Sequence, residues 1–178
     1  MQTASASSLE KALASGQPVI TAEITPPVGG DPSHALEMAE GLRGQVQAFN
    51  VTDGSRAVMG MSSLALCRLL LERGLEPILQ FGCRDRNRIA LQADLLGAHA
   101  LGIRNVLCLT GDPVKAGNQP EARAVFDLES VRLLRQVQQL NGGIGPGGKP
   151  LADGAPALFP GAAADPQSAS WSGLKSRM

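Results

Sequence analysis

The sequence predicts an α/β protein built around a mainly parallel sheet. Strand-like and helix-like runs alternate, and successive strands begin about 27 to 31 residues apart, the length of one βα unit. Several of these strands are almost continuously apolar, as in parallel sheets covered by helices. An open doubly wound sheet and a (β/α)8 barrel both fit this pattern. No G-x-G-x-x-G follows the first strand, which disfavours the dinucleotide-binding form of the open sheet.

The individual elements follow from apolar spacing and from the turn residues between them. Strands are predicted at 18–25, 46–52, 77–81 and 105–110. Helices are predicted at about 32–42, 62–74 and 87–101, and from Asp127 as N-cap to about 141. The apolar side chains expected to face the core are Leu36, Met38 and Ala39; Leu64, Cys67, Leu70 and Leu71; Ile89, Ala93, Leu96 and Ala100; and Leu128, Val131 and Leu134.

The chain has 178 residues, whereas a complete (β/α)8 barrel needs about 250. At about 30 residues per unit, five or six of the eight units are expected. We expect residues 1–17 to form a flexible or helical extension and residues 18–178 to form the partial barrel. The Gly/Pro-rich segment 141–156 is predicted to be a loop, with a fifth strand near 157–163.

Composition excludes several classes of function. The 16 Lys and Arg residues balance the 16 Asp and Glu residues, so the chain has no electrostatic footprint for nucleic acid or an anionic membrane. No apolar run approaches the roughly 20 residues that span a bilayer. The three cysteines show no paired spacing for a disulfide framework, so we expect a reducing, cytoplasmic location. Neither histidine has a Cys or His partner at metal-ligand spacing, so we expect no metal site. Cys83 would be a nucleophile only if a histidine approached it in space.

Polar or ionisable residues stand where each predicted strand ends, the place where parallel α/β folds gather functional groups. These ends carry Glu23, Thr52 with Asp53, Gln80 to Arg84, and Thr110 to Asp112. Glu23 lies within a strand, and side-chain alternation would turn it inward in a barrel. A buried carboxyl has a raised pKa and could act as a general acid. A rim carboxylate paired with an arginine is an equally good interpretation.

Two other polar groups also allow a functional and a structural interpretation. The arginines at 84, 86 and 88 could clamp phosphates or a polyglutamate tail. They could instead pair with Asp94 and with Asp85, the latter as a helix cap, and this interpretation is somewhat favoured. Asp112, in Gly-Asp-Pro directly after a strand, could face a ligand or cap amides in a turn.

With these residues laid out, the sequence resembles the methylenetetrahydrofolate reductase family. Order and spacing match from about residue 19 to 134, and more loosely over 159–166. The matching pieces are Ala22–Pro27, Asn50–Thr52, Cys83–Arg88 with Leu95–Gly97, Gly102–Val106, Leu109–Pro113 and Phe126–Leu128.

The resemblance implies a (β/α)8 barrel of the TIM type that holds FAD, with about five of its eight βα units present. Family members reduce 5,10-methylenetetrahydrofolate to 5-methyltetrahydrofolate, with NADH or NADPH first reducing the flavin. Glu23 matches the family's general acid, which helps to open the five-membered ring of the folate. Asp112 matches an aspartate near flavin and pterin whose charge tunes the flavin. Both residues are thereby implied to be catalytic and to contact the folate.

The resemblance also implies a set of flavin-contacting positions, several of which depart from the family pattern. Thr52 and Gly111 lie where the family contacts the flavin. Gln80 replaces a frequent histidine, Thr110 an arginine, Gly161 a tyrosine and Asp165 a histidine, while Arg177 loosely matches a basic pair near the FAD phosphates. These departures suggest a divergent subgroup or an altered electron donor.

The length affects what the chain is expected to do alone. An unclosed barrel exposes two sheet edges and much of its interior. We therefore expect poor stability, completion by a second copy or a complementing chain, or a fragment of a longer product. Two further hypotheses remain open: a non-catalytic accessory subunit that binds folate or a partner protein, and a pterin methyltransferase in which Asp112 and Asn50 grip the pterin.

Overall fold

A computed structural model describes residues 6–163 and contains one sheet of five parallel strands. The strands are β1 (Thr21–Ile24), β2 (Ala48–Val51), β3 (Pro77–Gly82), β4 (Asn105–Leu109) and β5 (Phe159–Ala162). They lie in the order β1-β2-β3-β4-β5, each parallel to the next. Each strand thus pairs with its successor, as in a barrel, whereas a doubly wound sheet reverses its strand order. The predicted α/β architecture is confirmed, with five strands of a TIM-barrel-type sheet.

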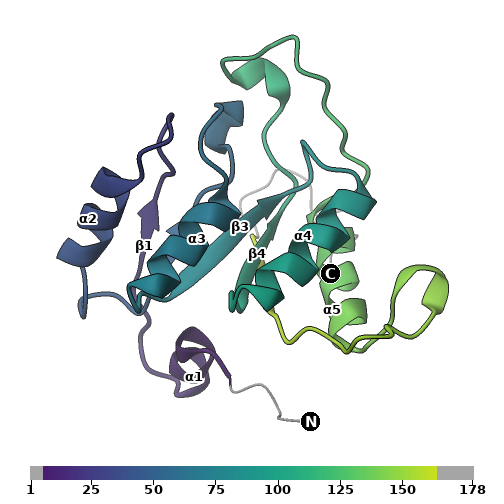
Figure 1. Ribbon diagram of the computed structural model, residues 1–178, viewed down its shortest axis with the longest axis horizontal. Coiled ribbons are helices and arrows are strands. Elements are labelled where there is room, and N and C mark those ends of the chain that lie inside the picture. The colour runs from purple at the N-terminus through teal and green to yellow at the C-terminus, as the bar shows by residue number, and fades with distance from the viewer. Residues whose placement is uncertain (1–5, 164–178) are drawn as a thin grey trace.

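Four helices connect the strands and cover one face of the sheet (Figure 1). They are α2 (Ser33–Gly41), α3 (Ser63–Glu72), α4 (Arg88–Ala100) and α5 (Ser130–Asn141). Alternate strand side chains point into this helical layer and form the main core with it. Its largest fully buried members on the strands are Ile24, Phe49, Val51, Leu79 and Phe81. The other face would line the interior of a barrel, and among residues 6–163 only α1 packs on it.

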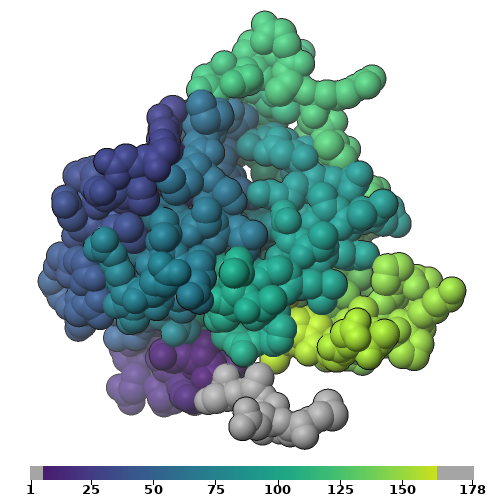
Figure 2. All heavy atoms as spheres, viewed as in Figure 1, coloured from purple at the N-terminus to yellow at the C-terminus, as the bar shows by residue number. Residues whose placement is uncertain are grey.

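A short N-terminal helix, α1 (Ser8–Ala14), covers the uncovered face at the amino ends of the strands. Leu9 is buried there against Ala48 and Ile78. The Ser7 hydroxyl caps α1 by accepting from the Glu10 amide and donates a 2.6 Å hydrogen bond to Asn105 Oδ1. In Figures 1 and 2, α1 lies at the bottom of the molecule and the β4–α5 loop protrudes at the top.

The sequence-based assignment of the buried face of α4 was wrong. Ile89 and Leu96 are 75% and 39% exposed, and Ala93 and Ala100 are exposed as well. The buried side chains are Leu91, Leu95 and Ala98. Both sets repeat at i, i+4 and i+7, so apolar spacing alone does not choose between them. On α2, in the same way, Ala35 is buried and Met38 is 49% exposed.

The start of α5 also differs from the prediction. Its N-cap is Glu129, and Asp127 instead forms an ion pair with Arg88 at 2.8 Å. The free Ser130 amide donates to Thr110 Oγ1 at 3.1 Å, so a residue at the end of β4 takes over the capping. The buried face of α5 consists of Leu133, Val137 and Leu140 rather than Val131 and Leu134. Across residues 6–163, no helix is long and apolar enough to cross a membrane.

Candidate functional site

The carboxyl ends of β2, β3 and β4 surround a cavity of about 230 Å³. Four residues predicted from the sequence to contact a cofactor line it, namely Gln80, Thr110, Gly111 and Asp112. The remaining lining comes from Asp53, Gly54, Ser55, Gly82, Arg84 and Leu109. The topology therefore brings strand ends that are about 30 residues apart in sequence to one opening.

Glu23 does not line this cavity. It points to the uncovered face of β1, opposite Asn50 in the β1–β2 register, and Asn50 Nδ2 donates to Thr21 Oγ1 at 3.0 Å. Glu23 is exposed, so the expectation of a buried carboxyl does not hold for the residues described. The inward direction does hold, because Ala22 and Ile24 pack on the helical side.

Thr52, the first residue after β2, has an unusual environment. Its side chain is only 2% exposed, and its hydroxyl has no hydrogen-bond partner among residues 6–163. It lines a smaller cavity of about 50 Å³ that shares Gly54 and Ser55 with the larger one. Leaving a buried hydroxyl unpaired costs about 1–3 kcal/mol, so its position favours a ligand that supplies the missing partner.

Asp112 joins the loop after β4 to the loop after β2. Its Oδ2 accepts a 2.8 Å hydrogen bond from the Arg56 amide. Arg56 and Ala57 have φ of 54° and 56°, a left-handed conformation that is unfavourable for residues with a side chain. The two loops are in close contact, because a Cβ on Gly117 would lie 1.8 Å from the Ala57 carbonyl oxygen. Asp112 thus holds a strained loop in place and keeps Oδ1 without a bond inside the described chain.

Two neighbours of Asp112 also have defined structural contacts. The Thr110 hydroxyl accepts from the Ser130 amide and donates to Ser130 Oγ at 3.3 Å. Gly111 has φ of +94°, and a Cβ at this position would lie 3.0 Å from Arg84 Cβ. Glycine is therefore required at 111, and the main chain itself forms the cavity wall there.

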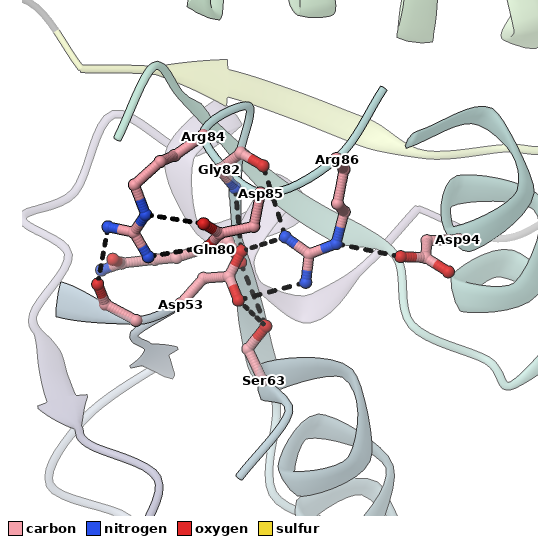
Figure 3. Close-up of polar contacts among 9 residues, drawn as sticks. Asp53, Ser63, Gln80, Gly82, Arg84, Asp85, Arg86 and Asp94 are labelled. Atoms are coloured by element: carbon pink, nitrogen blue, oxygen red, sulfur yellow. Dashed lines mark hydrogen bonds and ion pairs between the residues drawn. The ribbon is translucent and has the colours of Figure 1, made fainter. Parts of the chain in front are cut away.

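Two of the three clustered arginines are fully engaged with carboxylates and main-chain oxygens (Figure 3). Arg86 binds both oxygens of Asp53, at 2.6 and 3.3 Å, and its Nε donates to Asp94 at 3.1 Å. Its guanidinium also stacks on the Phe81 ring, 4.9 Å from the centroid. Arg84 pairs with Asp85 at 2.7 Å and donates to the Gly54 carbonyl at 3.1 Å. The structure therefore supports the predicted pairing with aspartates, although Asp85 is not the helix cap, which is Asn87.

The remaining candidates from the sequence have no reactive environment. Burial raises the pKa of the Cys83 thiol to about 11, with a further contribution from Glu129, so it is not poised as a nucleophile. All three cysteines are free and buried. His99 forms hydrogen bonds with the Arg104 side chain and the Ala157 amide, which lie before the amino ends of β4 and β5 and not at the carboxyl ends that form the cavity. Over residues 6–163, no cluster of three or more His, Cys, Asp or Glu side chains could hold a metal.

The other predicted contacts are in β5 or beyond it. Gly161 lies in β5 opposite Leu107, where a Cβ would meet the Leu107 side chain at 3.7 Å, and it does not line the cavity. Asp165 and Arg177 lie outside the described residues. The sequence placed Asp53 and Arg84 at the strand ends; Arg84 was expected either to clamp phosphates or to pair with an aspartate, whereas Asp53 was given no role. The only available signal was their position beside Thr52 and Cys83.

Comparison with known proteins agrees with this geometry. The profile of one family, methylenetetrahydrofolate reductase, matches residues 8–178, which is nearly the whole chain. No curated protein matches the sequence closely enough to narrow this further. A profile match of this extent, together with a parallel barrel-type sheet and polar strand ends, establishes that the chain belongs to the methylenetetrahydrofolate reductase family.

Proposed function

We propose that this chain supplies the flavin-binding and folate-binding half of a methylenetetrahydrofolate reductase. The reaction is the reduction of 5,10-methylenetetrahydrofolate to 5-methyltetrahydrofolate with NADH or NADPH as electron source. The observation that carries the proposal is the buried Thr52 hydroxyl, which has no partner among the described residues and lines the small cavity next to the opening formed by the strand ends. Family membership indicates the reaction type, and this hydroxyl indicates where the cofactor would bind.

The residues at the opening fit the polar edge of a flavin. A bound flavin would give the Thr52 hydroxyl the partner that it lacks among the described residues. Gly111 brings main chain to the cavity wall without a side chain in between. Gln80 supplies an amide that can donate and accept at the same cavity. Thr110 would contact the cofactor from the end of β4, and Gly161 leaves the neighbouring part of β5 without a side chain. When bound, the flavin would supply hydride transfer, which no protein side chain can perform.

Two carboxylates would have separate tasks. Glu23 would donate a proton to the folate ring system from the uncovered face of β1. A folate lying over this face would exclude water from the carboxyl. Asp112 would keep a negative charge near the flavin, because Oδ2 is fixed by the Arg56 amide while Oδ1 is available. Buried free thiols also suit the reducing, cytoplasmic location expected from the sequence.

A flavin titration of the purified 178-residue chain tests the proposal. We expect a perturbed absorbance spectrum and altered flavin fluorescence at saturation, with far-UV circular dichroism confirming that the chain is folded. Addition of NADH or NADPH should bleach the bound flavin, and 5,10-methylenetetrahydrofolate should restore its colour. A folded chain that ignores FAD would contradict the proposal. If that chain still bound tetrahydrofolate, the accessory-subunit and pterin-methyltransferase hypotheses would be favoured instead.

A further inference from the structure

The Asp53–Arg86 ion pair lies beside the site, and both of its side chains are mostly buried. The Asp53 side chain is 12% exposed and that of Arg86 is 19% exposed. Asp53 Oδ1 accepts from Ser63 Oγ at 3.2 Å and from Arg86, and Oδ2 accepts from the Gly82 amide at 3.0 Å and from Arg86. All four bonds are made to the protein, so this carboxylate has no acceptor capacity left for a cofactor.

The donors that hold Asp53 come from three separate parts of the fold. Ser63 is the first residue of α3, Gly82 the last of β3, and Arg86 belongs to the loop before α4. Arg86 is in turn fixed by Asp94 on α4 and by the Gly82 carbonyl at 3.3 Å. Figure 3 shows Asp53 at the centre of this arrangement. Asp53, the residue after Thr52, is therefore held by α3, by the end of β3 and by the loop before α4.

This anchoring matters because the segment around Asp53 is held in an unfavourable state. Thr52 keeps a buried hydroxyl without a partner among the described residues, and Arg56 and Ala57 have left-handed φ values of 54° and 56°. A free turn would relax by rotating the Thr52 hydroxyl toward water. Gly54 is further confined by Arg84, whose guanidinium would lie 2.6 Å from any Cβ at that position.

We infer that Asp53 and Arg86 are positioning residues, which hold the Thr52 hydroxyl in the orientation that a ligand at the strand ends requires. They act through Thr52 rather than by touching the ligand. The inference rests on the proposed function for the identity of the ligand, which is flavin, but the rigidity of the turn at 52–54 can be measured without it.

A double-mutant cycle with FAD as the probe tests this role. Asp53→Asn keeps the shape of the side chain and removes its charge, and Thr52→Val removes the hydroxyl. We expect Asp53→Asn to weaken FAD binding about tenfold in the wild-type chain, equivalent to about one hydrogen bond. In the Thr52→Val background it should weaken binding less than about twofold. Equal losses in both backgrounds would mean that Asp53 acts on the fold in general, and would overturn the inference.

Asp94→Asn is the matched control within the same network. It removes one partner of Arg86 on α4 but leaves all four bonds of Asp53 in place. It should leave FAD affinity within about twofold of wild type. Amide hydrogen exchange on the full chain provides a readout without FAD: exchange in residues 52–57 should accelerate at least about tenfold in Asp53→Asn and stay unchanged in Asp94→Asn.

The two measurements separate failure of the inference from failure of the proposed function. If the wild-type chain does not bind FAD, the proposed function fails and the exchange rates alone decide whether Asp53 holds the turn. If wild type binds FAD but Asp53→Asn changes neither affinity nor exchange, the inference fails and the proposed function stands.

Discussion

The two ends of the parallel sheet are built differently. At the amino ends of the strands, α1 covers the sheet and Leu9 is buried. The side chain of Asn105 is fully paired there: its Oδ1 accepts from the Ser7 hydroxyl, and its Nδ2 donates to Glu76 and to the Pro77 carbonyl. At the carboxyl ends, Thr52 lacks a partner and Arg56 and Ala57 are left-handed. The polar groups named at the amino ends are paired, whereas the carboxyl ends combine the fully bonded Asp53 with an unpartnered Thr52 hydroxyl and a strained loop.

This contrast teaches that stability and ligand binding are separated along the strand direction in this chain. Conformational strain persists only where surrounding structure imposes it, and it clusters at functional sites. The strain here coincides with the end at which barrel enzymes carry their active sites. Substitutions at the carboxyl ends should therefore change activity or FAD binding more than stability, and substitutions at the amino ends should do the reverse. Four predictions follow from this contrast.

The largest effect is expected for Glu23→Gln at the carboxyl end. Loss of the proton donor should slow reoxidation of the flavin by 5,10-methylenetetrahydrofolate about a hundredfold or more, while reduction by the nicotinamide is unchanged. Rapid mixing of each half-reaction measures the two rates separately. Because Glu23 is exposed and makes no ion pair in the described chain, the melting temperature should not move. An equal fall in both half-reactions would assign Glu23 a structural role.

Leu9→Ala at the amino end should produce the opposite signature. Leu9 is 6% exposed and packs on Ala48 and Ile78, so its truncation should lower the free energy of unfolding by about 2–3 kcal/mol. FAD affinity per folded molecule should not change. Urea unfolding followed by circular dichroism measures the first quantity and a flavin titration the second. Leu13→Ala on the same helix is the control, since Leu13 is 51% exposed and should lose less than about 0.5 kcal/mol.

Thr52→Val should sharpen the comparison because it separates stability from binding at a single residue. Valine has the shape of threonine without the hydroxyl, so the free energy of unfolding should rise by up to about 1 kcal/mol. FAD should bind about tenfold more weakly. Thermal melts with and without FAD measure both effects. Thr25 is exposed and lines the same small cavity, so Thr25→Val should change neither the free energy of unfolding nor the FAD affinity. A loss of stability in Thr52→Val would contradict the prediction, because it would show that the Thr52 hydroxyl has a partner.

The sequence was sufficient to predict the strands and their ends, because βα spacing and apolar runs are local properties. It did not predict which stripe of α4 is buried, since Ile89, Ala93 and Leu96 repeat with the same spacing as the buried Leu91, Leu95 and Ala98. That choice depends on how the helix is rotated by its tertiary contacts. The Asp53–Arg86 pair was not predicted for a similar reason, because it joins residues 33 positions apart.

The smallest expected effect comes from the Arg88–Asp127 pair, a structural contact at the functional end. The side-chain and main-chain hydrogen bonds from Arg88 lower the pKa of Asp127 from 3.8 to about 2. A lowered folded-state pKa means that the pair stabilises the protein fully above about pH 3.8 and loses this contribution as the pH falls toward 2. The stability difference between wild type and Asp127→Asn should therefore be small at pH 7, because solvent screens the pair, and should disappear as the pH falls through about 2. Denaturant titrations at several pH values measure it. Arg88→Gln should show a weaker pH dependence, because it removes the side-chain bonds but leaves the main-chain amide of residue 88 bonded to Asp127. A difference that stayed constant down to pH 2 would place the effect of Asp127 in packing rather than in its charge.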